Sequence, residues 1–394
     1  MAPDSALLVT LLVAGAGIIG WFLGRHVWRS ARPRARRDLP ADYFAGLNYL
    51  INEQPDRAVE VFTRMLDVDS ETVEVHFALG SLFRRRGEVD RAIRIHQSIL
   101  DRPALDSSQR EQAVLELAVD YLRAGLLDRS EQLFQRLTTS PTHRVAALRA
   151  LTRIYEQQRD WSQAIAAHRQ LEASGGGTQP TAVAHCLCEL AEGALTQGDV
   201  GEARRLLRES RRERRRFPRA AMVRATIAQA SGDDALAVKL LTIALQRQPV
   251  LLIEVLPRLQ ASSQRLGNPQ VFAAALALPR RDVQQRRELA QSLILADVMD
   301  HPAALGVVRD YLASDGLLRE FVAPLGMVEK LDDQALLRVA RLLGRILGRG
   351  PRYRCSECGF AGQTWFWQCP GCKSWDSLGA QFTDSGTGAH GVAT

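Results

Sequence analysis

The sequence predicts an all-α protein: a superhelical solenoid of helix pairs, with one transmembrane helix at its N-terminus and a small metal domain at its C-terminus. Three observations support this prediction: an uncharged N-terminal stretch of 20 residues, a pattern of small and aromatic residues repeated every 34 positions, and four cysteines in one short C-terminal window. Aromatic residues make up only 6% of the chain, which favours helix over sheet. At 394 residues, the chain should form more than one module.

The N-terminal segment Ser5–Gly24 carries no charge, and as a helix it spans about 30 Å, the thickness of a bilayer core. Six arginines follow between residues 25 and 37. A secretory signal has its positive charge before the apolar run, so this order indicates a single-pass anchor with the rest of the chain on the cytoplasmic side. The alternative for residues 1–25 is a buried core helix.

The net charge of +7 lies largely beside this anchor, because residues 1–38 hold those six arginines against only Asp4 and Asp38. We expect residues 26–40 to be a basic juxtamembrane linker that meets anionic lipid. Nucleic acid is the alternative ligand for this run, but the charge does not extend evenly along the chain. We therefore expect no nucleic-acid partner.

The middle of the chain repeats itself at an interval of 34 residues. Gly46, Tyr49 and Ala58 recur as Gly80, Phe83 and Ala92. A small residue, an aromatic residue three positions later and alanine nine positions after that resemble the tetratricopeptide repeat, in which small residues allow two antiparallel helices to approach closely. We expect such repeats over residues 41–249, and degenerate helical repeats with a cap over residues 250–348, where the helical period persists but the signature weakens.

Four cysteines near the C-terminus form two Cys-x-x-Cys turns separated by ten residues. The predicted ligands of one metal ion are Cys355, Cys358, Cys369 and Cys372. Two such turns complete a tetrahedral site of four thiolates, which either zinc or iron accepts. We place this metal domain at residues 349–380 and a flexible tail at 381–394. Tyr353, Phe360, Trp365 and Trp375 should form an apolar shell around it. A pair of disulfides does not suit a reducing cytoplasm, and a redox dithiol is a further alternative.

Other candidate residues have plainer explanations. Cys186 and Cys188 lie two apart on a predicted helix and point in different directions, so we expect them to be packing residues. His96 and His168 occupy the repeat position held elsewhere by Phe62 and Phe134, which also indicates packing.

Nine arginines lie between residues 204 and 219. Our first interpretation is a solvated helix face, the second an acidic protein partner, and the third RNA, because no aromatic platform is interleaved. The chain carries no phosphate-binding loop, nucleophile elbow or metalloprotease motif, so we expect no enzyme.

The metal segment resembles the rubredoxin-type or zinc-ribbon family, although its ten-residue spacer is much shorter than in rubredoxins, which weakens an electron-transfer function. The whole order of parts resembles the lipopolysaccharide assembly protein B family. The most specific stretches are residues 42–100, with Gly46–Pro55 and Ala78–Glu88, and residues 355–375. That resemblance implies an inner-membrane adaptor that regulates lipopolysaccharide biosynthesis, with the metal domain packed back against the repeats.

The same resemblance implies three protein partners. They are the membrane protease FtsH, its substrate the LpxC deacetylase, and the membrane regulator PbgA/YejM. The implied function is to promote degradation of LpxC by FtsH. A membrane-anchored scaffold that organises lipopolysaccharide synthesis or transport proteins without directing proteolysis is the alternative, followed by a rubredoxin-like redox protein. Whether the solenoid forms a homodimer stays open.

Overall fold

A computed structural model describes residues 44–46, 48–49, 52, 54–68, 73–103, 105–277, 283–314 and 332–381. The predicted anchor, the basic linker and most of the C-terminal tail lie outside these residues. Within the described part of the chain, no helix combines the length and the apolar character needed to cross a bilayer.

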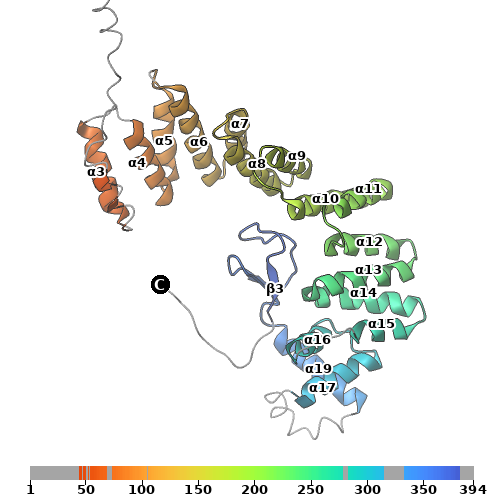
Figure 1. Cartoon of the computed structure of the whole chain (residues 1–394). Coiled ribbons are helices and arrows are strands. Elements are labelled where there is room, and N and C mark those ends of the chain that lie inside the picture. Colours follow the sequence, from red (N-terminus) through yellow and green to blue (C-terminus); the bar gives the residue numbers. More distant parts are fainter. Residues whose placement is uncertain are drawn as a thin grey trace, which may run out of the picture. The chain divides into compact units, whose positions relative to one another are not determined.

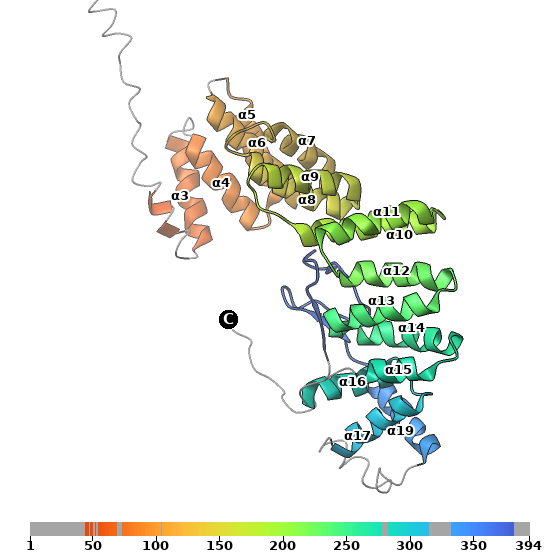
Figure 2. The same ribbon diagram turned by 45° about the vertical axis from the view of Figure 1, so that its right-hand side comes forward.

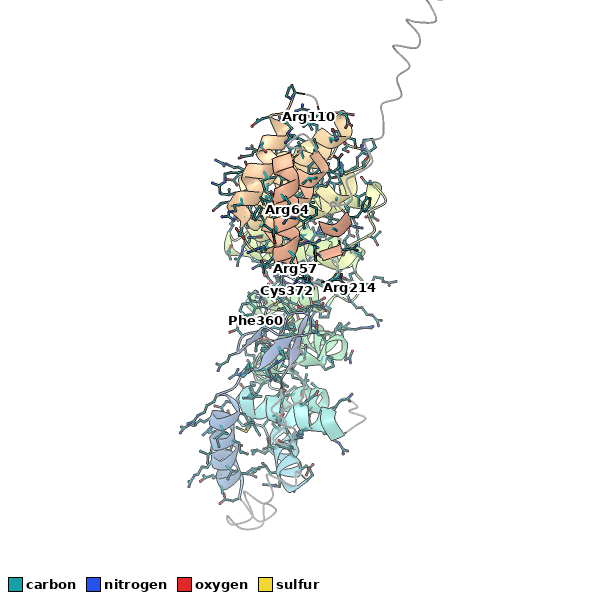
Figure 3. All side chains as sticks on the ribbon, turned by 90° about the vertical axis from the view of Figure 1, so that its left-hand side faces the viewer. Arg57, Arg64, Arg110, Arg214, Phe360 and Cys372 are labelled. Atoms are coloured by element: carbon teal, nitrogen blue, oxygen red, sulfur yellow. The ribbon has the colours of Figure 1, made fainter. Side chains whose placement is uncertain are left out.

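The described chain is helical up to residue 347 and divides into two compact units at residue 130 (Figure 1). The first unit contains α3 (Pro55–Val68), α4 (Val73–Arg85), α5 (Val89–Leu100) and α6 (Ser107–Arg123), and α7 (Leu127–Leu137) follows across the division. Exposed arginines of α3, such as Arg57 and Arg64, are labelled in Figure 3.

The second unit stacks further antiparallel helix pairs (Figure 2). The pairs are α8 (Arg144–Gln158) with α9 (Trp161–Ala173), α10 (Pro180–Thr196) with α11 (Val200–Glu213), and α12 (Pro218–Ala230) with α13 (Asp234–Arg247). After the 3-10 turn η1 (Pro249–Leu251) come α14 (Leu252–Arg265), α15 (Pro269–Leu276), α16 (Val283–Leu295), α17 (Pro302–Ser314) and α19 (Asp333–Leu347). These helices confirm the predicted solenoid.

The second helix of several pairs begins at an aspartate. Asp160, Asp199 and Asp233 each accept a hydrogen bond from a backbone N–H three residues later, at distances of 3.1, 2.8 and 3.0 Å. Such a cap satisfies one of the free donors at a helix start. These three aspartates therefore fix where α9, α11 and α13 begin.

Close approach of the two helices in a pair accounts for the repeated small residues. Ala58 and Ala92 are fully buried, and a Cβ atom added to Gly80 on α4 would collide with the His96 ring on α5. His96 is itself buried and hydrogen-bonded to Asp120, whose carboxylate also accepts a hydrogen bond of 2.7 Å from Arg84. His96 is thus a packing residue with a polar partner, as predicted.

We expect Gly80→Val to destabilise the first unit by about 2 kcal/mol, because the added carbons overpack the α4–α5 contact. Urea unfolding followed by circular dichroism measures the change, and hydrogen exchange should locate it in α4 to α6. The matched control is Gly193→Ala on α10, where nothing lies within 4 Å of the added Cβ. That change should stabilise its helix by about 0.8 kcal/mol. Equal effects of the two substitutions would contradict the close-packing argument.

Candidate metal centre and its contact with the repeats

The four predicted cysteine ligands lie in a small module built on a three-stranded antiparallel sheet. Its strands are β1 (Tyr353–Cys355), β2 (Ala361–Gly362) and β3 (Leu378–Ala380), in the order β2-β1-β3. Tyr353 pairs with Gly362 on one side and with Ala380 on the other. The sheet brings both ends of the module together and holds Cys355 opposite Leu378.

The two Cys-x-x-Cys segments fold into equivalent turns. In the first, Cys355 N–H donates to the Phe360 carbonyl at 2.8 Å, and Gly359 N–H donates to the Cys355 carbonyl at 3.0 Å. In the second, Cys369 N–H donates to the Ser374 carbonyl at 2.9 Å, and Lys373 N–H donates to the Cys369 carbonyl at 2.9 Å. Gly359 and Lys373 both have positive φ, at 72° and 61°. The turns therefore present their sulfurs in the same way.

The four sulfur atoms lie within 4.8 Å of one another. The distance between Cys355 Sγ and Cys372 Sγ is 3.6 Å, and that between Cys358 Sγ and Cys369 Sγ is also 3.6 Å. A tetrahedral ion with metal–sulfur bonds of about 2.3 Å needs sulfurs about 3.8 Å apart. Four cysteines arranged in this way could hold one metal ion, zinc or iron.

The electrostatics of the cluster also suit a cation. A hydrogen bond with Ser377 lowers the pKa of the Cys355 thiol to about 6, and a hydrogen bond with Ser374 lowers the pKa of Cys372. The Phe360 amide also lowers the pKa of Cys358, but burial and the three neighbouring sulfurs outweigh it and raise that pKa to about 11. Without a cation, the cluster cannot readily carry four thiolates; a divalent ion would remove this repulsion.

The module, here called the knuckle (residues 353–380), packs against the first helices of the repeat pairs in the second unit. In Figures 1 and 2 it lies alongside α12 to α14, and Figure 3 marks the positions of Cys372 and Phe360. Glu156 on α8 is one contact point: its Oε2 accepts hydrogen bonds from Gln368 Nε2 at 2.9 Å and from Trp375 Nε1 at 3.1 Å. Its other oxygen lies 2.9 Å from His168 Nε2.

His185 on α10 forms the second contact point. Its fully buried ring stacks on Trp375, with ring centroids 4.4 Å apart and planes 12° apart, and its Nε2 lies 2.9 Å from Asp376 Oδ1. Burial lowers the pKa of His185 although Asp376 acts in the opposite direction, so the ring is held neutral. Arg219 on α12 lies over the Trp367 ring at 5.7 Å.

An apolar contact completes the interface on α14. Ile253 packs against a cluster that contains Tyr353, Cys355 and Cys369. The hydroxyl of Tyr353 donates a hydrogen bond of 3.1 Å to Glu254, while burial raises the pKa of that hydroxyl. The knuckle therefore contacts α8, α10, α12 and α14, the four first helices of the second unit.

The structure also corrects part of the expected apolar shell. Tyr353 and Trp365 do pack together, with centroids 5.3 Å apart, but Trp375 stacks on His185 of the repeats. The module is too small to enclose its own tryptophans, so the solenoid supplies the remaining surface. Cys186 and Cys188 are fully buried on α10, where burial raises the pKa of Cys188 to about 12. Both are packing residues, as expected.

Sequence reasoning missed Glu156 and His185. Glu156 is one of many charged residues on helix surfaces, and nothing local marks it. His185 stands at the start of an otherwise apolar helix, which was a signal for a buried polar partner. The arginine run did contain two interface residues without revealing them: Arg214 lies 3.4 Å from Asp376, and Arg219 lies over the Trp367 ring.

We expect the double substitution Cys355→Ser and Cys358→Ser to abolish metal binding, because it removes half of the ligand set. Elemental analysis of the purified protein should fall from one metal ion per chain to none. The backbone amides of residues 353–380 should lose their protection from hydrogen exchange in the same sample. Cys186→Ala with Cys188→Ala is the control and should retain one ion. A full metal content in the double serine variant would refute this assignment of ligands.

Glu156→Ala should weaken docking of the knuckle by roughly 1–2 kcal/mol, because it leaves the half-buried donors of Gln368 and Trp375 without their acceptor. Faster hydrogen exchange of residues 365–377, with unchanged metal content, is the expected result. Glu172→Ala removes an exposed carboxylate from the neighbouring helix α9 and should change neither quantity. If Glu156→Ala leaves exchange unchanged, the carboxylate does not hold the interface.

Comparison with known proteins agrees with this architecture. Residues 353–380 match a family model described as a rubredoxin metal binding domain, and residues 45–106, 147–179 and 188–250 match tetratricopeptide repeat models. Among solved structures, the C-terminal part of a TPR repeat-containing protein from Cytophaga hutchinsonii is 11% identical. That match has a TM-score of 0.40 and covers 71% of this chain and 98% of the other.

Two curated relatives align along nearly their whole length. The chain is 28% identical over 387 residues to lipopolysaccharide assembly protein B of Haemophilus influenzae, which covers 94% of this chain and 97% of that protein. It is 33% identical over 380 residues to lipopolysaccharide assembly protein B of Escherichia coli K12, with the same coverage. The chain therefore belongs to the lipopolysaccharide assembly protein B family, a family of scaffold proteins rather than enzymes.

Proposed function

We propose that this protein is an inner-membrane adaptor that regulates lipopolysaccharide biosynthesis by promoting FtsH-dependent degradation of the LpxC deacetylase. The observation that supports this proposal most directly is the alignment with two proteins named for lipopolysaccharide assembly, at 97% coverage of each. The names of these relatives refer only to lipopolysaccharide assembly. The proteolytic part of the proposal comes from the family resemblance of the sequence.

The proposed mechanism is proximity, without chemistry on the adaptor itself. Residues 1–25 would anchor the chain in the inner membrane, with residues 41–380 on the cytoplasmic side. A soluble enzyme held by the repeats would then meet a membrane protease within a thin layer, which raises its effective concentration. The membrane regulator PbgA/YejM would act on the anchored adaptor and restrain it.

The arrangement of the second unit supports a scaffold whose partner surfaces are fixed in advance. In tetratricopeptide arrays the first helix of each pair usually holds a peptide or protein. Here the first helices α8, α10, α12 and α14 contact the chain's own knuckle. The knuckle would hold its metal through Cys355, Cys358, Cys369 and Cys372. That metal would stabilise the module, and the module would in turn keep the first helices in one arrangement.

Depletion of the protein in its native bacterium should lengthen the half-life of LpxC several-fold, measured by immunoblotting after protein synthesis is blocked. The effect should disappear in cells whose FtsH is already inactive, because the adaptor then has no protease to supply. Complementation with the wild-type chain should restore rapid degradation.

Two variants, each expressed in the depleted cells, test whether the metal ligands are needed for degradation of LpxC. The double serine variant of Cys355 and Cys358 should fail to restore degradation, whereas the double alanine variant of Cys186 and Cys188 should succeed. If depletion leaves the half-life of LpxC unchanged, the proteolytic function is wrong. The anchored scaffold that organises lipopolysaccharide proteins without directing proteolysis would then take its place.

A further inference from the structure

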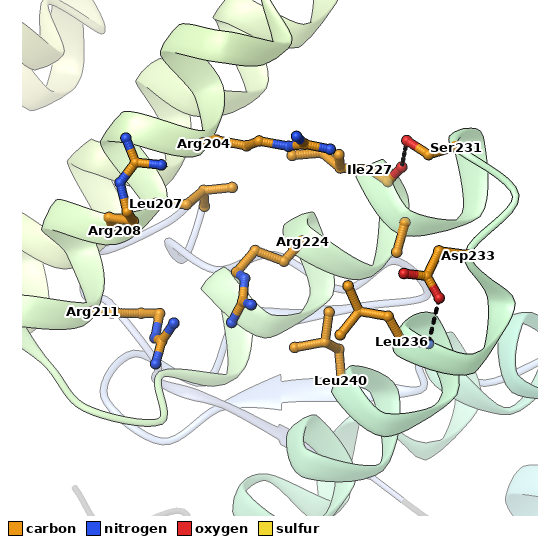
Figure 4. A pocket seen from close by; sticks show the side chains of 11 residues that line it. Arg204, Leu207, Arg208, Arg211, Arg224, Ile227, Ser231, Asp233, Leu236 and Leu240 are labelled. Atoms are coloured by element: carbon orange, nitrogen blue, oxygen red, sulfur yellow. Dashed lines mark hydrogen bonds between the residues drawn. The ribbon is translucent and has the colours of Figure 1, made fainter.

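A groove on the second unit is lined by arginines from two neighbouring helices. Arg204, Arg208 and Arg211 come from α11 and Arg224 from α12, and the groove has a volume of about 440 Å³ (Figure 4). We call it the arginine groove. Its remaining lining residues come from α11, α12 and α13 and include Leu207, Ile227, Asp233, Leu236 and Leu240. The spacing of Arg204, Arg208 and Arg211 places them on one face of α11.

The four groove arginines form no ion pair within the described part of the chain, unlike Arg205, Arg214 and Arg219 of the run at residues 204–219. Arg205 pairs with Glu202 at 2.5 Å, and Arg219 pairs with Glu189 at 2.8 Å. The single acidic residue among the lining residues described, Asp233, is already engaged, because its carboxylate caps α13 by accepting the Leu236 N–H. Three arginines of the run are therefore paired and three line the groove, while Arg212, Arg215 and Arg216 are exposed outside it.

Arg224 is the half-buried member of this set, and the exposed Arg211 repels it. Burial and the neighbouring Arg211 both lower the pKa of Arg224. Charges of one sign that line a cleft with low-dielectric walls attract a ligand of the opposite sign. Carboxylates in the groove would remove the repulsion and form charge-assisted hydrogen bonds with guanidinium groups.

The floor of the groove is apolar, so a ligand that binds there must carry apolar groups as well as negative charge. Leu207, Ile227 and Leu240 form buried parts of it, and Leu236 is 37% exposed. Figure 4 shows Arg204 reaching from α11 across the groove toward Ile227. A ligand that fits must therefore carry negative charge at its edges and apolar groups between them. Nucleic acid fits less well, because no aromatic ring lines the groove for base stacking.

The groove lies on a different side of the repeats from the knuckle. Arg219 of α12 faces the knuckle at Trp367, and Arg224 lines the groove. Five residues along a helix correspond to a rotation of about 140°, so these two side chains leave α12 in different directions. A ligand in the groove would leave the knuckle interface undisturbed.

The chain's own undescribed segments supply little of the needed charge. Residues 315–331 carry three acidic against two basic side chains, a net charge of −1. Residues 1–38 have a net charge of +4, and residues 382–394 contain Asp384 as their sole acidic residue. A second copy is also a poor match, because the whole chain carries +7. We propose that the arginine groove is a docking site for an acidic amphipathic helix of another protein, with carboxylates on successive turns and Leu, Ile or Phe between them.

The test uses the full-length protein in neutral detergent and a set of fluorescent probe peptides of about 18 residues, or five helical turns. One probe carries Glu at i, i+4 and i+7 with Leu between these positions. A second has the same composition in scrambled order, and a third has Gln in place of Glu. We expect micromolar binding of the first probe alone, weakened by added salt. Binding should be at least about tenfold weaker for the double variant Arg204→Glu with Arg208→Glu.

The matched control is Arg212→Glu with Arg215→Glu, which changes the charge by the same amount on exposed residues outside the groove. It should bind as tightly as the parent, and circular dichroism should show all variants equally folded. Equal weakening by both double variants, or no binding of any probe, would overturn the proposal. So would groove-dependent sedimentation with vesicles of phosphatidylglycerol without peptide binding, since the ligand would then be lipid. These outcomes are independent of the half-life of LpxC.

Discussion

The contact between the knuckle and the first helices of the repeats joins four helix pairs of the second unit to one module. A module of about thirty residues has too little interior to fold by burial alone, so it depends on a metal and on a surface that another part of the chain provides. The surface here combines one carboxylate, Glu156, with the aromatic stack of His185 on Trp375. Glu156 and Trp375 are half-buried, and removing the carboxylate would leave the Trp375 Nε1–H without its acceptor.

This contact changes which surfaces of the solenoid are free to bind other proteins. The side that tetratricopeptide arrays usually offer is covered from α8 to α14 by the chain's own C-terminal segment. Partners of the second unit must then use the knuckle itself or another side of the repeats, such as the arginine groove lined by α11, α12 and α13. A metal module can in this way direct binding to another side of the repeats without touching any partner.

Sequence alone predicted the helical solenoid and the cysteine cluster, because both depend on local spacing. The period of 34 residues relates Gly46 to Gly80 and Phe62 to His96, and each glycine meets the ring 16 positions later. Two Cys-x-x-Cys turns bring their sulfurs together. The docking residues could not be found in this way. Glu156 and Trp375 are 219 positions apart, and their contact depends on how the intervening helices stack. Likewise, only the structure separates Arg219, which is paired, from Arg224, which is not.

The hydrogen bond between Glu156 and Gln368 joins residues that are 212 positions apart, and this has a consequence for how the protein folds and unfolds. Repeat arrays are nearly one-dimensional, so their ends can fray one unit at a time. Here the C-terminal end returns to the middle of the array and closes a large ring. Closing that ring late in folding is slow, because a long loop must lose its freedom first. Once the ring is closed, we expect the helices that contact the knuckle, from α8 to α14, to unfold together rather than one pair at a time.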